Sequence, residues 1–135
     1  MNALAIAGVE DNDRRLVRCP LVERHGRFHL DADALREQLA GDVRMLLLCN
    51  PHNPTGRVFT ESELRAVADL ALERDLLVVS DEVHCDLVMP GHRHIPFGQL
   101  AGSRAVTVIS PNKTFNTAGM PQSTFIIPDP AVRAV

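Results

Sequence analysis

Residues 43–81 read VRMLLLCNPHNPTGRVFTESELRAVADLALERDLLVVSD, and this stretch decides the fold. It opens on an apolar run at residues 43–49, which is the pattern of a strand covered on both faces. The run passes into NPHNPTG, residues 50–56, where two prolines and a glycine exclude regular structure. The sequence therefore predicts a shaped loop at the carboxyl end of a buried strand.

A helix and a second strand follow this loop. Thr60 and Glu63 form a capping box, which starts a helix that reaches about Arg74. The apolar residues of this segment recur at helical spacing, at Leu64, Val67, Ala68, Ala71 and Leu72. Residues 76–80 predict a second buried strand that ends at Asp81. Together these elements predict a βαβ unit with parallel strands and a right-handed crossover.

The rest of the chain adds elements to the same sheet. Residues 105–110 predict a third buried strand, and residues 125–127 predict a fourth strand at the edge. Asp31 is expected to N-cap a helix over residues 32–40, which Gly41 would end. The remaining predictions are the end of a short helix at 3–9, an extended segment at 15–21, a turn at His25-Gly26 followed by a short strand, and a loop at 89–98. The predicted fold class is α/β, three-layer αβα, with a mainly parallel sheet.

Composition excludes several classes of protein. The chain has 135 residues, which fits one domain, and its net charge of −3 with no Tyr or Trp gives no case for nucleic acid. No apolar run reaches the roughly 18 residues that span a bilayer, and the first residues do not resemble a secretory signal. Three cysteines without a CxxC pair predict reduced, partly buried thiols. We therefore expect a cytoplasmic protein without a membrane partner.

Polar groups follow three of the predicted strands. Asn53 follows the first strand, Asp81 the second, and Ser110 and Lys113 the third. Open α/β sheets bind ligands at the carboxyl ends of their strands, so these groups are expected to converge on one edge. Each residue also has a plainer interpretation: Asp81 as a cap, Asn53 as a turn former, and Lys113 as a solvated loop residue.

The set has a chemical logic when it is taken together. Lys113 is the only lysine among 14 Lys and Arg residues, and a lysine in a partly dry cleft can form an imine, whereas arginine cannot. Coding bias is the alternative explanation of that count. The Asp81 carboxylate would meet a protonated pyridine nitrogen, because a carboxylate at the end of a buried strand needs a cation or donors. An Asn53 amide can hydrogen-bond a phenolic oxygen, and Ser110 can donate to a phosphate.

The histidines raise the question of a metal site. His84, His92 and His94 include an HxH pair, which is a possible ligand pair for zinc. The pair lies in a predicted loop, and Cys85 would point away from His84 on an extended segment. No metal is therefore expected.

Three motifs carry a resemblance to a known family. NPHNPTG, SDEVHCDL and SPNKTFNTAG, in this order and spacing, resemble the aminotransferase superfamily that depends on pyridoxal 5'-phosphate (PLP) and has the aspartate-aminotransferase fold. With GHRHIPF added, the set is typical of the cystathionine β-lyase-like branch, also called cysteine-S-conjugate β-lyases. The resemblance covers nearly the whole chain.

The resemblance implies a role for each site residue. Lys113 is the catalytic lysine that forms the Schiff base with PLP, and Asp81 pairs with the pyridinium nitrogen. Asn53 hydrogen-bonds the ring oxygen, and Ser110 contacts the phosphate. His84 stands where many aminotransferases have a tyrosine that also touches the ring oxygen, and histidine there favours the β-lyase-like branch.

The resemblance also has departures. Many relatives have an arginine eight residues after the lysine, and this chain has Pro121 there, followed by Gln122. Residues 1–135 are expected to be a partial PLP-binding large domain, in which the phosphate-loop segment and the small C-terminal domain are absent. A homodimer is expected for the intact parent.

Three functions remain open at this stage. The first is a PLP-dependent carbon–sulfur β-lyase that releases a thiol, pyruvate and ammonia from cystathionine or cysteine S-conjugates. The second is a class I/II aminotransferase acting on an amino acid. The third is a catalytically dead truncated remnant.

Overall fold

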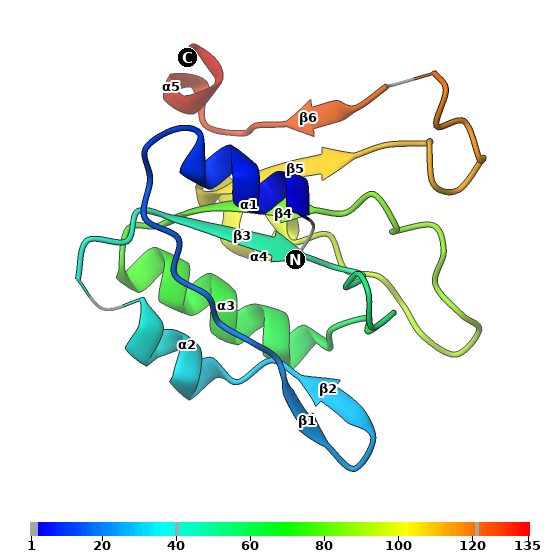
Figure 1. Ribbon diagram of the computed structural model, residues 1–135, viewed down its shortest axis with the longest axis horizontal. Helices are drawn as coiled ribbons and strands as arrows, with labels where there is room; N and C mark the ends of the chain where they lie inside the picture. The colour runs from blue at the N-terminus through cyan, green and yellow to red at the C-terminus, as the bar shows by residue number, and fades with distance from the viewer. Residues whose placement is uncertain (1–2, 40, 121) are drawn as a thin grey trace.

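A computed structural model describes residues 3–39, 41–120 and 122–135, with the side chains of residues 3–5 left out (Figure 1). The elements in chain order are α1 (Ala3–Glu10), β1 (Val22–Arg24), β2 (Arg27–His29), α2 (Ala32–Gln38), β3 (Met45–Cys49), α3 (Glu61–Glu73), β4 (Leu77–Asp81), α4 (Gly98–Ala101), the 3₁₀ helix η1 (Gly102–Arg104), β5 (Ala105–Ile109), β6 (Thr124–Ile126) and α5 (Pro130–Arg133). Within these ranges, no helix is long and apolar enough to cross a bilayer.

The central sheet confirms the predicted topology. Its strand order is β3-β4-β5-β6, in which β3, β4 and β5 run parallel and β6 pairs antiparallel at the edge. The fold class is α/β with a mainly parallel sheet, as predicted. β1 and β2 form a separate hairpin, and its turn at His25-Gly26 is also as predicted. Both turn residues have positive φ, 52° and 73°, which is a low-cost conformation only for the glycine.

The predicted helix caps are present. The Glu63 N–H donates to Thr60 Oγ1 at 3.3 Å, and the Thr60 N–H donates to Glu63 Oε2 at 2.8 Å, which completes the capping box of α3. Asp31 Oδ1 accepts a bond from the Ala34 N–H at 3.0 Å and so N-caps α2. This helix ends at Gln38 rather than at residue 40, which lies outside the described residues. The sequence also missed the short helices α4 and η1, which are too brief to show a periodic pattern.

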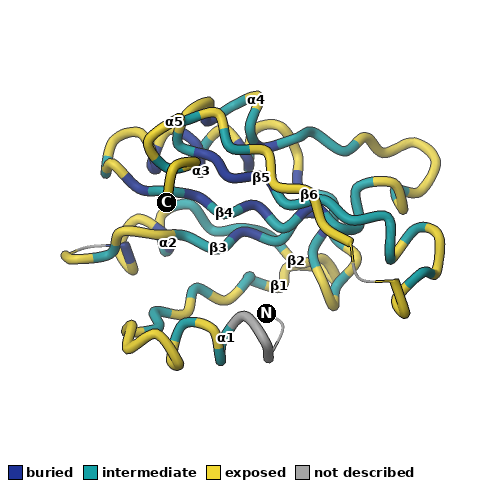
Figure 2. The backbone as a smooth tube through the Cα atoms, turned by 90° about the horizontal axis from the view of Figure 1, so that it is seen from above, coloured by how far each residue is buried: buried dark blue, intermediate teal, exposed yellow. Residues whose placement is uncertain are grey.

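One face of the sheet packs against helices. Leu48 of β3, Val78 of β4 and Ala105 of β5 belong to a single buried cluster that includes most of the inner face of α3. Because side chains alternate along a strand, the residues directly before and after each of these three point to the opposite face of the sheet. Figure 2 shows α3 and α4 on one side of the sheet and α1 on the other.

The second face of the sheet is less covered than predicted. Met45 of β3 is 52% exposed, so the expectation that this strand is covered on both faces is wrong at its start. A hollow of about 1180 Å³ is lined by β3, by α1 and by the extended segment 13–21, and its lining includes Met45, Leu47 and Ile6. An apolar strand sequence therefore does not reveal whether another element lies against each of its faces.

The two faces of β4 can be told apart by a matched pair of substitutions. Val78 is fully buried and its neighbour Val79 is partly exposed on the opposite face. We expect Val78→Ala to lower the free energy of unfolding by about 2 kcal/mol, because two buried methyl groups and their packing are lost. Val79→Ala, which has the same loss of strand propensity, should lower it by less than about 1 kcal/mol. Urea denaturation of both variants is the measurement, and equal losses would contradict the assignment of faces.

Candidate functional site

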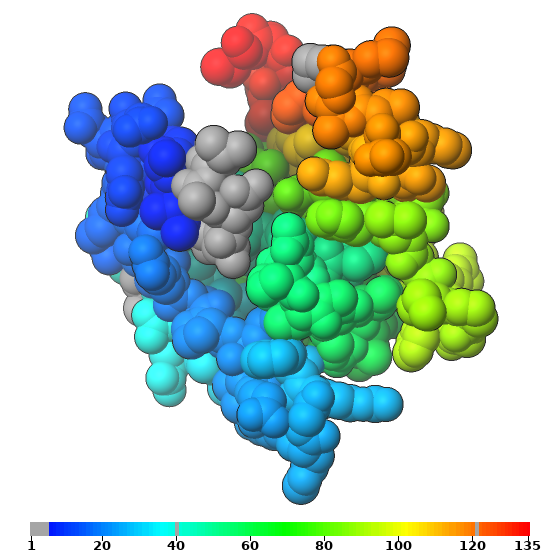
Figure 3. All heavy atoms as spheres, turned by 45° about the vertical axis from the view of Figure 1, so that its right-hand side comes forward, coloured from blue at the N-terminus to red at the C-terminus, as the bar shows by residue number. Residues whose placement is uncertain are grey.

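Three loops leave the sheet at the same edge. They follow β3, β4 and β5, whose parallel pairing places Cys49 opposite Asp81 and Asp81 opposite Val108. The strand ends are also joined beyond these pairs: the Asn50 N–H donates to the Asp81 carbonyl at 3.0 Å, and the Glu82 N–H donates to the Val108 carbonyl at 2.8 Å. Figure 3 shows the three loops, coloured turquoise, green and orange, side by side on one face of the molecule.

Asp81 and Ser110 occupy neighbouring strand ends on the less covered face. Asp81 is partly exposed between two buried residues, and its Oδ1 accepts a bond from the Val83 N–H at 3.3 Å. Ser110 lies two residues beyond Val108, the register partner of Asp81, so continuing alternation gives both side chains the same face. Ser110 Oγ donates to the Gln122 carbonyl at 2.7 Å and accepts from the Asn112 N–H at 3.2 Å. To donate to a phosphate, this hydroxyl must turn away from Gln122.

Asn53 lies in a tight turn after β3. The His52 N–H donates to the Arg57 carbonyl and the Gly56 N–H donates to the His52 carbonyl, both at 2.8 Å, which closes the turn over residues 53–56. Gly56 has a φ of 67°, where a side chain would be strained. Asn53 itself is exposed at this turn. Its amide is therefore free to meet a ligand, although turn formation alone would also account for its place.

Lys113 lies in the turn that follows β5. Backbone bonds from the Phe115 N–H to the Pro111 carbonyl, at 2.9 Å, and from the Thr117 N–H to the Asn112 carbonyl, at 3.1 Å, shape the segment around it. The lysine is exposed in the described structure, which also agrees with its plainer interpretation as a solvated loop residue.

His84 is partly buried in a turn over residues 83–86. The Cys85 N–H donates to the Glu82 carbonyl and the Leu87 N–H donates to the His84 carbonyl, both at 2.9 Å. The prediction that His84 and Cys85 lie on an extended segment is therefore wrong. Within the described ranges, no cluster of three or more His, Cys, Asp or Glu side chains has the geometry of a metal site. Pro121, which replaces the expected arginine, lies outside the described residues.

Cys49 is a neighbour of the candidate site that sequence reasoning did not single out. It is the register partner of Asp81, so both side chains share one face of the sheet. Burial raises the pKa of the Cys49 thiol, and the Asp81 carboxylate raises this pKa further, against the opposing effect of the Asn53 N–H. A thiol with a raised pKa stays protonated near neutral pH, so Cys49 is a poor nucleophile. The three cysteines are partly buried and free, as predicted.

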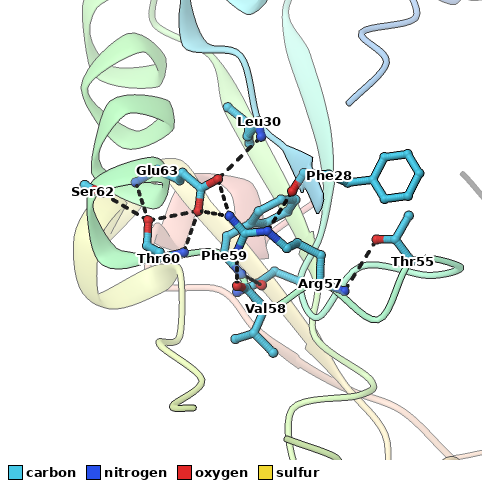
Figure 4. Close-up of polar contacts among 10 residues, drawn as sticks. Phe28, Leu30, Thr55, Arg57, Val58, Phe59, Thr60, Ser62 and Glu63 are labelled. Carbon is cyan, nitrogen blue, oxygen red and sulfur yellow. Dashed lines mark hydrogen bonds and ion pairs between the residues drawn. The ribbon is translucent and has the colours of Figure 1, made fainter. Parts of the chain in front are cut away.

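A polar network holds the loop after β3 in place (Figure 4). Both terminal oxygens of Glu63 accept bonds from Arg57 Nη2, at 2.7 and 2.8 Å, and the two side chains are only 19% and 15% exposed. Arg57 Nε also donates to the Phe28 carbonyl at 2.7 Å, which ties the loop to the β1–β2 hairpin. Arg57 thus joins the hairpin, the loop and the start of α3, and these contacts restrict the segment that carries Asn53.

Glu63 is a strongly hydrogen-bonded carboxylate. Burial acts to raise its pKa, but bonds from the N–H and hydroxyl of Thr60, the charge of Arg57 and the Leu30 N–H together hold the pKa below its usual value. The folded state therefore favours the ionised form.

The residues at the edge of the sheet fit a pyridine-aldehyde cofactor by their chemistry. A carboxylate (Asp81), an amide (Asn53), a hydroxyl (Ser110) and an amine (Lys113) come from three adjacent strand ends. The edge also has an unsatisfied polar atom, because Thr114 Oγ1 is buried without a hydrogen-bond partner in the described structure. These groups supply a cation partner, a donor for a phenolic oxygen, a donor for a phosphate and a group that can form an imine.

Comparison with known proteins identifies the family of this chain. Residues 5–131 match the family model described as aminotransferase class I and II, and the chain belongs to this family. The cofactor of the family is PLP. The predicted resemblance and the predicted fold class are both confirmed.

Individual relatives include lyases and an aminotransferase. The chain is 43% identical over 130 residues to cystathionine beta-lyase PatB of Bacillus subtilis (strain 168), covering 93% of this chain and 34% of that protein. It is 42% identical over 105 residues to the probable N-succinyldiaminopimelate aminotransferase DapC of Mycobacterium tuberculosis (strain CDC 1551 / Oshkosh), covering 76% of this chain and 26% of that protein. The crystal structure of the PLP-bound C-S lyase from Staphylococcus hominis superposes with a TM-score of 0.90 at 34% identity, covering 94% and 33% of the two chains. The chain thus spans about a third of the length of these two lyases.

The Glu63 network predicts a pH dependence of stability. Because the folded pKa of Glu63 lies below the unfolded value, its contribution is present above the ordinary glutamate pKa of about 4.3 and is lost as the pH falls through the folded pKa. We expect Glu63→Gln to be less stable than wild type near neutral pH and to lose less stability on acidification. Urea midpoints measured at several pH values test this expectation. Glu37→Gln, at an exposed position on α2, is the control, and parallel curves for wild type and Glu63→Gln would contradict the prediction.

Proposed function

We propose that this chain carries the PLP-binding edge of a carbon–sulfur β-lyase that acts on cystathionine or cysteine S-conjugates. The observation that supports the proposal is the position of Asn53, Asp81, Ser110 and Lys113 at or just after the carboxyl ends of three adjacent strands. Membership of a PLP-dependent family and the similarity to cystathionine beta-lyase PatB over 93% of the chain support it.

Each residue has a role in the proposed reaction. When bound, PLP accepts the electron pair released at the substrate Cα. Asp81 binds the pyridine nitrogen and holds a proton there, while Asn53 and His84 bind the ring oxygen and Ser110 binds the phosphate. Lys113 Nζ would hold the cofactor covalently and, once released, would accept the Cα proton as general base. The electron pair left at Cα would form a double bond to Cβ as the Cβ–S bond breaks and the sulfur leaves as a thiolate. Addition of water would release the rest of the substrate as pyruvate and ammonia.

An aminotransferase is the second candidate, and the relative DapC favours it with 42% identity. Transamination would begin with the same proton transfer to Lys113, which would then return the proton to the cofactor, and no thiolate would leave. The greater share of this chain that is covered by PatB supports the lyase over the transaminase. His84, in place of the tyrosine that many aminotransferases have, supports the same choice.

The wider organisation of the protein follows from the same proposal. Residues 1–135 would form part of a PLP-binding large domain, and the intact parent would be a homodimer that acts on small amino acids. A cytoplasmic location remains a prediction.

The covalent role of Lys113 has a direct test, because Lys113 is the only lysine in the chain. Incubation with PLP, reduction with borohydride and peptide mass spectrometry should place a phosphopyridoxyl group on Lys113. Lys113→Arg keeps the positive charge but should abolish the adduct and the visible absorption band. Modification restricted to the N-terminal amine would contradict the proposal and would support a catalytically inactive remnant.

The choice between lyase and transaminase needs a substrate assay. The longest natural polypeptide that contains this chain should release pyruvate and thiol from cystathionine. Lys113→Ala should lower the rate of pyruvate release by about 10³-fold or more, since the residue that binds the cofactor covalently and acts as the base is lost. Rapid transfer of the amino group to a keto acid without pyruvate release would favour the transaminase instead.

A further inference from the structure

The residue after Asp81 is a buried carboxylate with no role in the proposed reaction. Glu82 is 1% exposed, and a carboxylate in that position is strongly unfavourable unless donors meet it. Three donors do so: Ser80 Oγ reaches Oε1 at 2.8 Å, the Phe97 N–H reaches Oε1 at 2.9 Å, and His94 Nε2 lies 2.7 Å from Oε2. We call these four residues, Ser80, Glu82, His94 and Phe97, the Glu82 cluster.

The surroundings of the two ring nitrogens of His94 favour a proton on Nε2 over one on Nδ1. An ionised Glu82 can only accept, so its contact with His94 then needs a proton on Nε2, while Nδ1 is buried without a partner in the described structure. Moving the proton to Nδ1 would leave a buried N–H unsatisfied and would also remove the donor to Glu82. The side chain is only 10% exposed, so water gives little help in either form.

The Glu82 cluster spans the loop that follows β4. Glu82 contacts residues 12 and 15 positions further along the chain, so the bonds to His94 and Phe97 join the two ends of the segment 83–93, whose middle is exposed. His84 lies at the start of that segment, in the turn that begins with the bond between the Cys85 N–H and the Glu82 carbonyl. Opening of the cluster would release this loop and the position of His84 with it.

The cluster also sets the direction of Asp81. Ser80 and Glu82 are both buried and bonded to each other on one side of the strand, so the residue between them must point to the other side. The Glu82 N–H is bonded to the Val108 carbonyl, and Asp81 Oδ1 accepts from the Val83 N–H. The backbone on both sides of Asp81 is therefore restrained by groups that belong to or adjoin the cluster.

We propose that Glu82 and His94 are positioning residues, which close the loop 83–93 and hold Asp81 and His84 in the orientation that the cofactor needs. The identity of the ligand that Asp81 and His84 would bind rests on the proposed function. Closure of the loop itself does not depend on that function, so the two ideas can fail separately.

The first experiment tests loop closure without any cofactor. Arg93 is exposed and directly precedes His94, which Glu82 holds. A protease binds residues on both sides of the bond it cleaves, so trypsin cleavage after Arg93 is expected to require release of His94 from Glu82. Glu82→Gln and His94→Ala should each speed this cleavage about tenfold or more, since Glu82→Gln weakens the three bonds at the carboxylate and His94→Ala removes one of them. They should also lower hydrogen-exchange protection of the Val83 N–H, which reports on Asp81.

Matched variants separate positioning from general destabilisation. His94→Gln keeps an N–H donor near the place of Nε2 and should restore much of the protection. His92→Ala and Asp86→Asn alter exposed residues of the same loop and should behave as wild type. In the double variant Glu82→Gln/His94→Ala, cleavage should be slower than the product of the two single effects predicts, because both substitutions act on the contact between Glu82 and His94.

The second experiment tests the link to the cofactor. With PLP present, Glu82→Gln and His94→Ala should require about tenfold more PLP than wild type to give half-maximal borohydride labelling of Lys113, and His94→Gln should come close to wild type. Faster cleavage with unchanged labelling would overturn the positioning role, and unchanged cleavage and Val83 protection would overturn loop closure. If wild type itself is not labelled at Lys113, the proposed function fails, while the cleavage data still decide whether the cluster closes the loop.

Discussion

In a parallel sheet the chain leaves every strand at the same edge. This constraint places the loops after β3, β4 and β5, with their polar side chains, at one edge of the sheet. The pairing of β3 with β4 and of β4 with β5 brings Cys49 beside Asp81, 32 positions later in the sequence, and Asp81 beside Val108, 27 positions later. The same pairing fixes which side chains share a face, so that Cys49, Asp81 and Val108 lie in one row. The candidate cofactor site is a consequence of this register rather than of any single loop.

The ends of the strands do not fix their loops by themselves, and two carboxylates restrain the loops at two of the three ends: Glu63, which is partly buried, and Glu82, which is buried. Glu63 anchors the loop after β3 through Arg57, and Glu82 anchors the loop after β4 through His94 and Phe97. Donors within the protein meet both carboxylates, so neither Glu63 nor Glu82 needs a ligand as its partner. The turn after β5 is held by backbone bonds and by the Ser110 hydroxyl, and Lys113 projects from it into solvent.

Local patterns in the sequence predicted the elements well because their causes are local. The capping box of Thr60 and Glu63, the Asp31 cap and the apolar runs of β3, β4 and β5 all act within a few residues. The partner of Glu82 could not be predicted in this way, because His94 lies 12 residues away in a loop without periodic pattern. Nor does the sequence reveal which of two adjacent carboxylates, Asp81 or Glu82, faces the helices. That choice depends on the register of the sheet, which is set by long-range pairing.

The central claim is that the carboxylate of Asp81 and the amine of Lys113 share one pyridine ring. Nitrogen NMR of the chain loaded with PLP labelled with ¹⁵N at the ring nitrogen tests it most directly. The account predicts a protonated ring nitrogen in wild type and its loss in Asp81→Asn, with the covalent link to Lys113 retained in both. An identical ring-nitrogen signal in wild type and Asp81→Asn would contradict the account, since Asp81 would then have no contact with the ring.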